Sequence, residues 1–190
     1  MKLSIRDITG SSILAGAPSG RSLFAHLIDA LPKGADSPRA IFLDFDGIEV
    51  ATASYLRESV LEFRDYTRGR KTPFYPVIAN ASPNVVDELI ELVQPRADVL
   101  LSCKLDEDGK ILRTQLIGVL EPMQRVTLEL LSNLGEASAS QLRDVGSDDI
   151  KTTAWNNRLA ALCNLGLIAE NSMGRTKFYR PLLSGGSHGY

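Results

Sequence analysis

Cysteine and histidine are scarce in this sequence of 190 residues, and their scarcity excludes two kinds of site. The two cysteines, Cys103 and Cys163, lie far apart and outside any Cys-x-x-Cys spacing, which indicates a reduced, cytoplasmic protein. The two histidines, His26 and His188, are also far apart, so no metal cluster can be built on them. We therefore expect neither a metal nor a cofactor.

Excess charge of one sign and long apolar runs are lacking too. The formal net charge is −2, so no global basic field calls for nucleic acid, although a local patch could still bind it. No apolar run approaches the roughly 20 residues that span a bilayer. The N-terminus, MKLSIRDITGSS, lacks a charged region followed by an apolar core, so we expect no signal peptide and no membrane partner.

The pattern of apolar and amphipathic segments divides the chain near residue 120. In residues 1–120, apolar or alternating runs that predict strands are interspersed with amphipathic segments that predict helices. Strands are expected over 2–9, 40–45, 76–79, 99–105 and 111–120, and helices over 22–31, 54–68 and part of 80–94. The Asp-Gly turn between the last two strands predicts a hairpin.

From Glu121 onward the hydrophobic period changes, which predicts a second domain over 121–183. Three helices are expected, over 122–134, 138–146 and 151–166, followed by a hairpin over 167–182 with Met173-Gly174 at its tip. Residues 151–190 hold five basic residues against Glu170 alone, so positive charge is concentrated toward this end. Residues 184–190 have the composition of a disordered tail.

The stretch Phe42-LDFDG-Gly47 resembles the first motif of the haloacid dehalogenase superfamily. The resemblance implies a phosphatase in which Asp44 is the nucleophile and Asp46 the general acid and base. However, Ile48 stands where that family has Thr. The Lys and acidic pair that would hold Mg²⁺ could only be Lys104 with Asp106 and Asp108, in the expected hairpin turn. We therefore expect no enzyme, and keep the phosphatase as the third hypothesis.

Residues 1–120 resemble the STAS-like domain family and the anti-sigma-factor antagonists more closely. The segment 44–48 (DFDGI) takes the place of Asp-x-Ser-Gly-Val, and 52–56 (TASYL) that of Asp-Ser-Ser-Gly-Leu. Downstream, 80–89 is similar to the segment Asn-x-Ser-Pro-x-Val-x-x-x-Leu. The resemblance implies an α/β domain, a mixed sheet with helices, that docks a protein partner such as a kinase or ATPase.

In phosphorylatable antagonists the second Ser of the pair receives phosphate, and that position is Ser54 here. A helix start stabilises a phosphate through its free N–H groups and its dipole. Thr52 replaces the family's Asp, and Tyr55 replaces a Gly that lets a partner approach. Because Ser is also a preferred N-cap, both a phosphoacceptor and a capping role for Ser54 stay open.

Residues 121–183 resemble the winged helix-turn-helix domain of bacterial regulators, a small α+β fold. Its recognition helix and first wing strand would be Thr153–Ile168, with the wing near Gly174–Pro181. Helical spacing buries Trp155, Leu159, Leu162 and Gly166 on one side of that helix. Asparagine can read adenine edges, while Lys, Arg and Thr contact phosphates. The expected DNA-binding residues are Lys151, Thr152, Thr153, Asn156, Asn157, Arg175 and Lys177.

The sequence therefore predicts a cytoplasmic regulator that binds double-stranded DNA, as a homodimer on a two-fold site. The STAS-like domain would mediate assembly or receive a protein signal. The alternative is an adaptor without catalysis, in which the face around Ser54 docks a kinase or ATPase and the winged helix is another protein surface.

Overall fold

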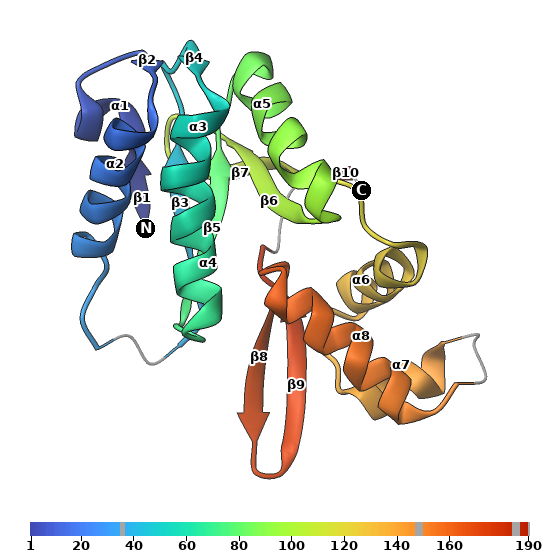
Figure 1. Ribbon diagram of the computed structural model, residues 1–190. Coiled ribbons are helices and arrows are strands. Elements are labelled where there is room, and N and C mark those ends of the chain that lie inside the picture. The colour runs from blue at the N-terminus through green and yellow to red at the C-terminus, as the bar shows by residue number, and fades with distance from the viewer. Residues whose placement is uncertain (35–36, 147–149, 184–186, 190) are drawn as a thin grey trace. The chain divides into compact units, whose positions relative to one another are not determined.

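The computed structural model describes residues 1–34, 37–146, 150–183 and 187–189. The chain divides into two compact units: the first contains Met1–Val119 together with residues 187–189, and the second runs from Leu120 to Leu183 among the described residues (Figure 1). Among the described residues, no helix is both long and apolar enough to cross a membrane.

The first unit is built on a mixed sheet, which confirms the prediction of an α/β domain at this coarse level. The strand order is β1-β3-β5-β6-β7-β10; β1, β3, β5 and β6 run parallel, and β7 is antiparallel to β6. A separate parallel pair joins β2 to β4. The strands are β1 (Lys2–Ser4), β2 (Ile13–Leu14), β3 (Arg39–Asp44), β4 (Val50–Ala51), β5 (Phe74–Ala79), β6 (Val99–Leu105) and β7 (Ile111–Gly118).

The last strand of the sheet differs from the predicted disordered tail over 184–190. Residues 187–189 form β10 (Ser187–Gly189), which pairs in parallel with Arg113–Gln115 of β7. Without β10, β7 would be an edge strand with unpaired N–H and C=O groups, and backbone pairing to such an edge does not depend on the apolar pattern that predicts strands. Residues 184–186 and 190 of the predicted tail lie outside the described residues.

The helices of the first unit pack on this sheet (Figure 1). They are α1 (Ile5–Thr9), α2 (Ala17–Asp29), α3 (Ala53–Leu56), the π-helix η1 (Arg57–Leu61), α4 (Glu62–Gly69), α5 (Pro83–Val93) and the 3₁₀-helix η2 (Gln94–Arg96). The predicted strand over 2–9 is wrong after Ser4. The Ser4 hydroxyl accepts a hydrogen bond from the Asp7 N–H and caps α1, and Gly10 ends it with φ +69°.

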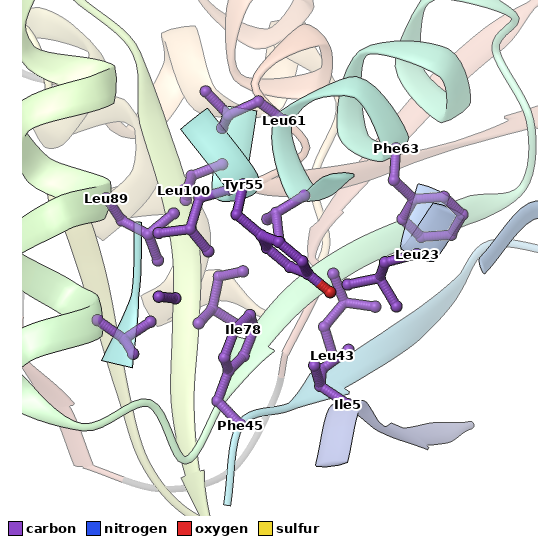
Figure 2. Close-up of a cluster of buried hydrophobic side chains, with 14 of the residues drawn as sticks. Ile5, Leu23, Leu43, Phe45, Tyr55, Leu61, Phe63, Ile78, Leu89 and Leu100 are labelled. Carbon is purple, nitrogen blue, oxygen red and sulfur yellow. The ribbon is translucent and has the colours of Figure 1, made fainter. Parts of the chain in front are cut away.

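The core of the first unit lies between sheet and helices. Ile41 and Leu43 lie on the same face of β3 and are fully buried, whereas Phe42, on the opposite face, is only half-buried. Figure 2 shows the ring of Tyr55 inside this cluster, among side chains from β3, β5 and α2. Burying a side chain such as Leu43 or Phe63 stabilises the fold by about 1.5–3 kcal/mol.

In the part of the second unit that the structure describes, three helices and a two-stranded hairpin stand at the positions that the hydrophobic period predicts. They are α6 (Pro122–Leu134), α7 (Ala139–Val145), α8 (Thr152–Asn164), β8 (Ile168–Met173) and β9 (Thr176–Pro181). Ala137, between α6 and α7, forms an antiparallel bridge to Tyr179 of β9. Ser138 and Gln141 form a capping box that starts α7.

Burial of the apolar face of α8 confirms its predicted orientation. Trp155, Leu159 and Leu162 are at most 1% exposed and pack inside the unit. At the end of α7, a Cβ on Gly146 would lie 2.6 Å from Cζ2 of Trp155, so this position has no room for a side chain. The hairpin tip is one residue later than predicted, because the strands pair up to Met173 and Thr176 and leave Gly174-Arg175 between them.

Candidate functional site

A concave face of about 560 Å³ lies on the second unit, between α8, the first turn of α7 and the β8–β9 hairpin. We call it the concave face. Five of the seven residues predicted to contact DNA line it: Thr152, Asn156, Asn157, Arg175 and Lys177. The structure therefore brings together side chains from the first half of α8 and from the β8–β9 hairpin, which are separated in the sequence by the rest of α8 and by β8.

Helical geometry explains the α8 side of this face. Thr152, Asn156 and Ala160 follow one another at intervals of four residues, so they form one row along the helix. Asn157 lies beside this row, and the buried residues of α8 point the other way. Ala160 has a small side chain, which leaves the middle of the row open. The asparagine amides are exposed to solvent and to any ligand of the face.

The other two predicted residues, Lys151 and Thr153, do not line the concave face. Both are exposed at the start of α8, where Lys151 is the N-cap residue. Their side chains lie at the positive end of the helix dipole, so they suit an anion beside the face better than a contact inside it.

The hairpin side of the face carries both signs of charge. Lys177 Nζ lies 2.9 Å from a carboxylate oxygen of Glu170, and both side chains are partly exposed. Beneath them, burial together with the nearby Glu170 carboxylate raises the pKa of Tyr179 to about 12, so its hydroxyl stays protonated and donates to Glu170. Arg175, at the hairpin tip, is exposed. Lys177 is thus partly neutralised, whereas Arg175 is open to solvent.

Several residues of the concave face are not evident from the sequence. Ser138, Ser140 and Glu170 line it, and Arg143 donates a hydrogen bond of 3.0 Å to the Thr152 hydroxyl while pairing with Asp144. The pattern Ser138-x-x-Gln141 signals a capping box, and therefore the start of α7. Only the tertiary packing of α7 on α8 places these residues at the face, and no local pattern carries that information.

Ser54 lies inside the first turn of α3 rather than at its cap, so a capping role for Ser54 is wrong. Thr52 is the N-cap, and its hydroxyl accepts hydrogen bonds of 3.4 Å from the backbone N–H groups of Tyr55 and Gly16. Thr52 takes this position because its backbone is extended, with φ −77° and ψ 151°. The Ser54 hydroxyl is half-buried and lies 3.3 Å from that of Thr52.

Asp44 sits at the carboxyl end of β3 in a polar cluster that we call the sheet-edge cluster. It is 4% exposed, accepts a 2.9 Å hydrogen bond from the Asn80 amide and a 3.2 Å bond from the Asp46 N–H, and pairs with Lys2 at 3.2 Å. The Asn80 side-chain oxygen in turn accepts from the Leu105 N–H at 2.9 Å. Both oxygens of the Asp44 carboxylate and the side-chain amide of Asn80 therefore already have partners within the protein.

The same edge also contains Cys103, which is buried. Burial, with a smaller contribution from the Asp44 carboxylate, raises the pKa of the Cys103 thiol to about 12. A thiol with so high a pKa is protonated at neutral pH and is a poor nucleophile. Within the described residues, no three His, Cys, Asp or Glu side chains gather closely enough to hold a metal ion. Asp106 and Asp108, the acidic pair considered for Mg²⁺, lie in the β6–β7 turn, where the Asp106 carboxylate accepts a hydrogen bond from the Lys110 N–H.

No protein-family model matches this sequence, and no curated protein matches it.

Proposed function

We propose that this chain is a cytoplasmic transcriptional regulator that binds double-stranded DNA through its second unit. The order α6, Ala137 bridge, α7, α8 and β8–β9 supports a winged helix-turn-helix, with α8 as the recognition helix and the hairpin as the wing. The observation that carries the proposal is the concave face, where polar residues of α8 and basic residues of the hairpin meet.

The chemistry of the concave face fits the two kinds of contact that DNA offers. Asn156 and Asn157 are exposed amides on one helix, and an amide can make two hydrogen bonds to adenine in the major groove. Arg175 and Lys177 on the hairpin would contact the flanking phosphates. Lys151 and Thr153 lie outside the concave face, at the helix start, where a phosphate is also favoured.

Specific recognition by so small a module calls for two copies on a two-fold site. Helix α6 carries a row of apolar side chains toward solvent: Met123, Val126 and Leu134 are each more than 40% exposed. This row suits a second copy of the chain. The first unit would then contribute to assembly or receive a signal from a protein.

The same α6 row favours the second candidate, a non-catalytic adaptor that docks a kinase or ATPase. In that function Ser54 would be the phosphoacceptor, and a phosphate there would replace the present contact with Thr52. We propose no catalysis by Asp44, because its carboxylate is engaged by Asn80, Asp46 and Lys2.

The test is fluorescence anisotropy with DNA from upstream of the chain's own gene and with unrelated DNA of equal length, titrated against salt. Two protomers that each contact about three phosphates give a log–log salt slope of about −5. Asn156→Ala is expected to weaken specific binding about 5- to 150-fold. Arg175→Ala is expected to weaken binding to both DNAs and to make the slope shallower.

The matched control is Asn164→Ala. Asn164 is exposed on α8 like Asn156 but does not line the concave face, so the DNA affinity of this variant should equal that of the wild type. Absence of binding by the wild type, or equal losses in both asparagine variants, would contradict the proposal. A pull-down with Ser54→Glu would then test the adaptor.

A further inference from the structure

A separate pocket of about 310 Å³ opens in the first unit, between α1, the β2 segment and α2. We call it the α1–α2 pocket. Its floor is formed by Leu14, Leu23 and Tyr55, each 2% exposed, and its walls include Ile8 and Ile13. The volume falls at the lower end of the range for small-molecule sites, roughly 300–1,000 Å³.

The Tyr55 hydroxyl is the most informative group in this pocket. Among the described residues nothing hydrogen-bonds to it, although the side chain is almost fully buried. Figure 2 shows the hydroxyl extending past the core toward Leu23, which also lines the pocket. Burial raises the pKa of Tyr55 to about 12, so the hydroxyl is protonated at neutral pH and can donate a hydrogen bond.

The surrounding backbone fixes Tyr55 in this position. The Ser59 hydroxyl, in the π-helix η1, donates a 2.7 Å hydrogen bond to the Tyr55 carbonyl. On the other side, a Cβ on Gly20 would lie 2.6 Å from that carbonyl oxygen, so α2 packs directly on this turn. A phenylalanine would fill the same core space. The hydroxyl is therefore not explained by packing, and it is not among the fully enclosed polar atoms of the described residues, so its oxygen is accessible from the pocket.

The rim of the pocket is polar but carries little charge. Nδ1 of the His26 ring donates a 2.7 Å hydrogen bond to the Ser22 carbonyl, so Nε2 is the ring nitrogen that could bond to a ligand. Ser19 and Ser22 are exposed at the same rim. Asp, Glu, Lys and Arg are absent from the described residues that line the pocket. An ionised ligand would find no counter-charge there.

We propose that the α1–α2 pocket binds a small uncharged organic molecule, about one ring in size. A carbonyl oxygen of the ligand accepts a hydrogen bond from Tyr55, its ring packs on Leu14 and Leu23, and a second polar group meets Ser19, Ser22 or His26 at the rim. This inference concerns the first unit and does not depend on DNA binding by the second.

The test uses the full chain labelled with ¹⁵N and the neutral probe benzamide, followed by amide chemical shifts in NMR spectra. Benzamide should shift the amide signals of Ile8, Leu14 and Ser22 with a Kd on the order of 1 mM, as expected for so small a ligand. Benzoate has the same shape with a negative charge, and should cause no shifts at these positions.

Two variants make the test decisive. Tyr55→Phe should leave the fold intact and weaken benzamide binding about tenfold, because one hydrogen bond is lost. Ser22→Leu fills the pocket from its exposed rim and should abolish binding. The proposal is overturned if benzamide does not shift these amides, if benzoate binds equally well, or if Tyr55→Phe binds benzamide as tightly as the wild type.

Discussion

The polar side chains of the two units are arranged in opposite ways. In the first unit, Asp44 and Asn80 at the sheet edge bond to one another and to the backbone, and Arg64 and Asp98 form a second internal pair. In the second unit, Asn156 and Asn157 project from α8 into an open face.

The difference separates two uses of polar residues. A buried polar group must be satisfied within the protein, and once satisfied it has little capacity left for a ligand. Groups on an exposed face are satisfied by water, which a ligand can displace. The sheet-edge cluster is therefore expected to matter for stability and the concave face for binding. A variant in either place that changed both the stability of the fold and the affinity for a ligand would contradict this distinction.

The largest effect is expected at the Arg64–Asp98 pair. Arg64 is 7% exposed, and its guanidinium makes two hydrogen bonds to the Asp98 carboxylate. Asp98→Ala leaves this guanidinium buried without its main partner, so we expect a loss of about 3–5 kcal/mol in the free energy of unfolding. Chemical denaturation measures the loss. DNA binding by the folded fraction should be unchanged.

Asp65→Ala is the matched control, since Asp65 also accepts from Arg64, at 2.7 Å, but its side chain is 47% exposed. Its removal should cost at most about 1 kcal/mol. Burial alone would raise the pKa of Asp98, but the hydrogen bonds and charge of Arg64 outweigh burial and lower it below 3.8. The Asp98 contribution is therefore present above pH 3.8 and is lost as the pH falls through the lowered pKa. Equal losses in both variants would contradict this account.

A smaller effect is expected at Asn80, which joins β3 to β6. Its amide donates to Asp44, its side-chain oxygen accepts from the Leu105 N–H, and its backbone has φ +54°. Asn80→Ala removes both hydrogen bonds and places alanine in a left-handed conformation, so we expect a loss of about 2–4 kcal/mol.

Asn80→Gly separates the two causes, because glycine adopts positive φ freely. It should recover about 1 kcal/mol of the loss seen with alanine, as measured by urea denaturation. If the glycine and alanine variants are equally stable, the left-handed backbone at residue 80 carries no cost. If neither is destabilised, the sheet-edge cluster does not hold the strands together.

The sequence predicts the parts of the fold that depend on local periodicity. The three helices of the second unit and the β6–β7 hairpin follow from apolar spacing and from residues such as Gly135 and Gly109. The alternating pattern over 2–9 predicts the strand correctly up to Ser4 but extends it too far, because the short capped helix α1 fits the same pattern over Ile5–Thr9. A local pattern does not reveal that a distant edge strand needs a partner, and β10 was missed for that reason.

The candidate sites follow the same division. Spacing along α8 predicts which side of the helix is exposed, so Asn156 and Asn157 could be found from the sequence. The partners that change the properties of a site come from other elements: Asn80 meets Asp44 from the next strand, and Glu170 meets Lys177 across the hairpin. The tip of the β8–β9 hairpin predicted from the sequence, Met173-Gly174, is one residue too early. That tip implies a different register between the two strands, and therefore different pairs of facing side chains.

The smallest effect concerns the ion pair at the concave face. Glu170→Gln removes the charge that holds Lys177 and keeps an acceptor for the Tyr179 hydroxyl. Lys177 then becomes available to phosphate, so DNA affinity should rise about 2- to 5-fold at low salt, with a salt slope steeper by up to about one per protomer. Glu129→Gln makes the same change of charge on the exposed face of α6 and should leave affinity nearly unchanged. Equal gains in both variants would mean that net charge, rather than the release of Lys177, controls binding.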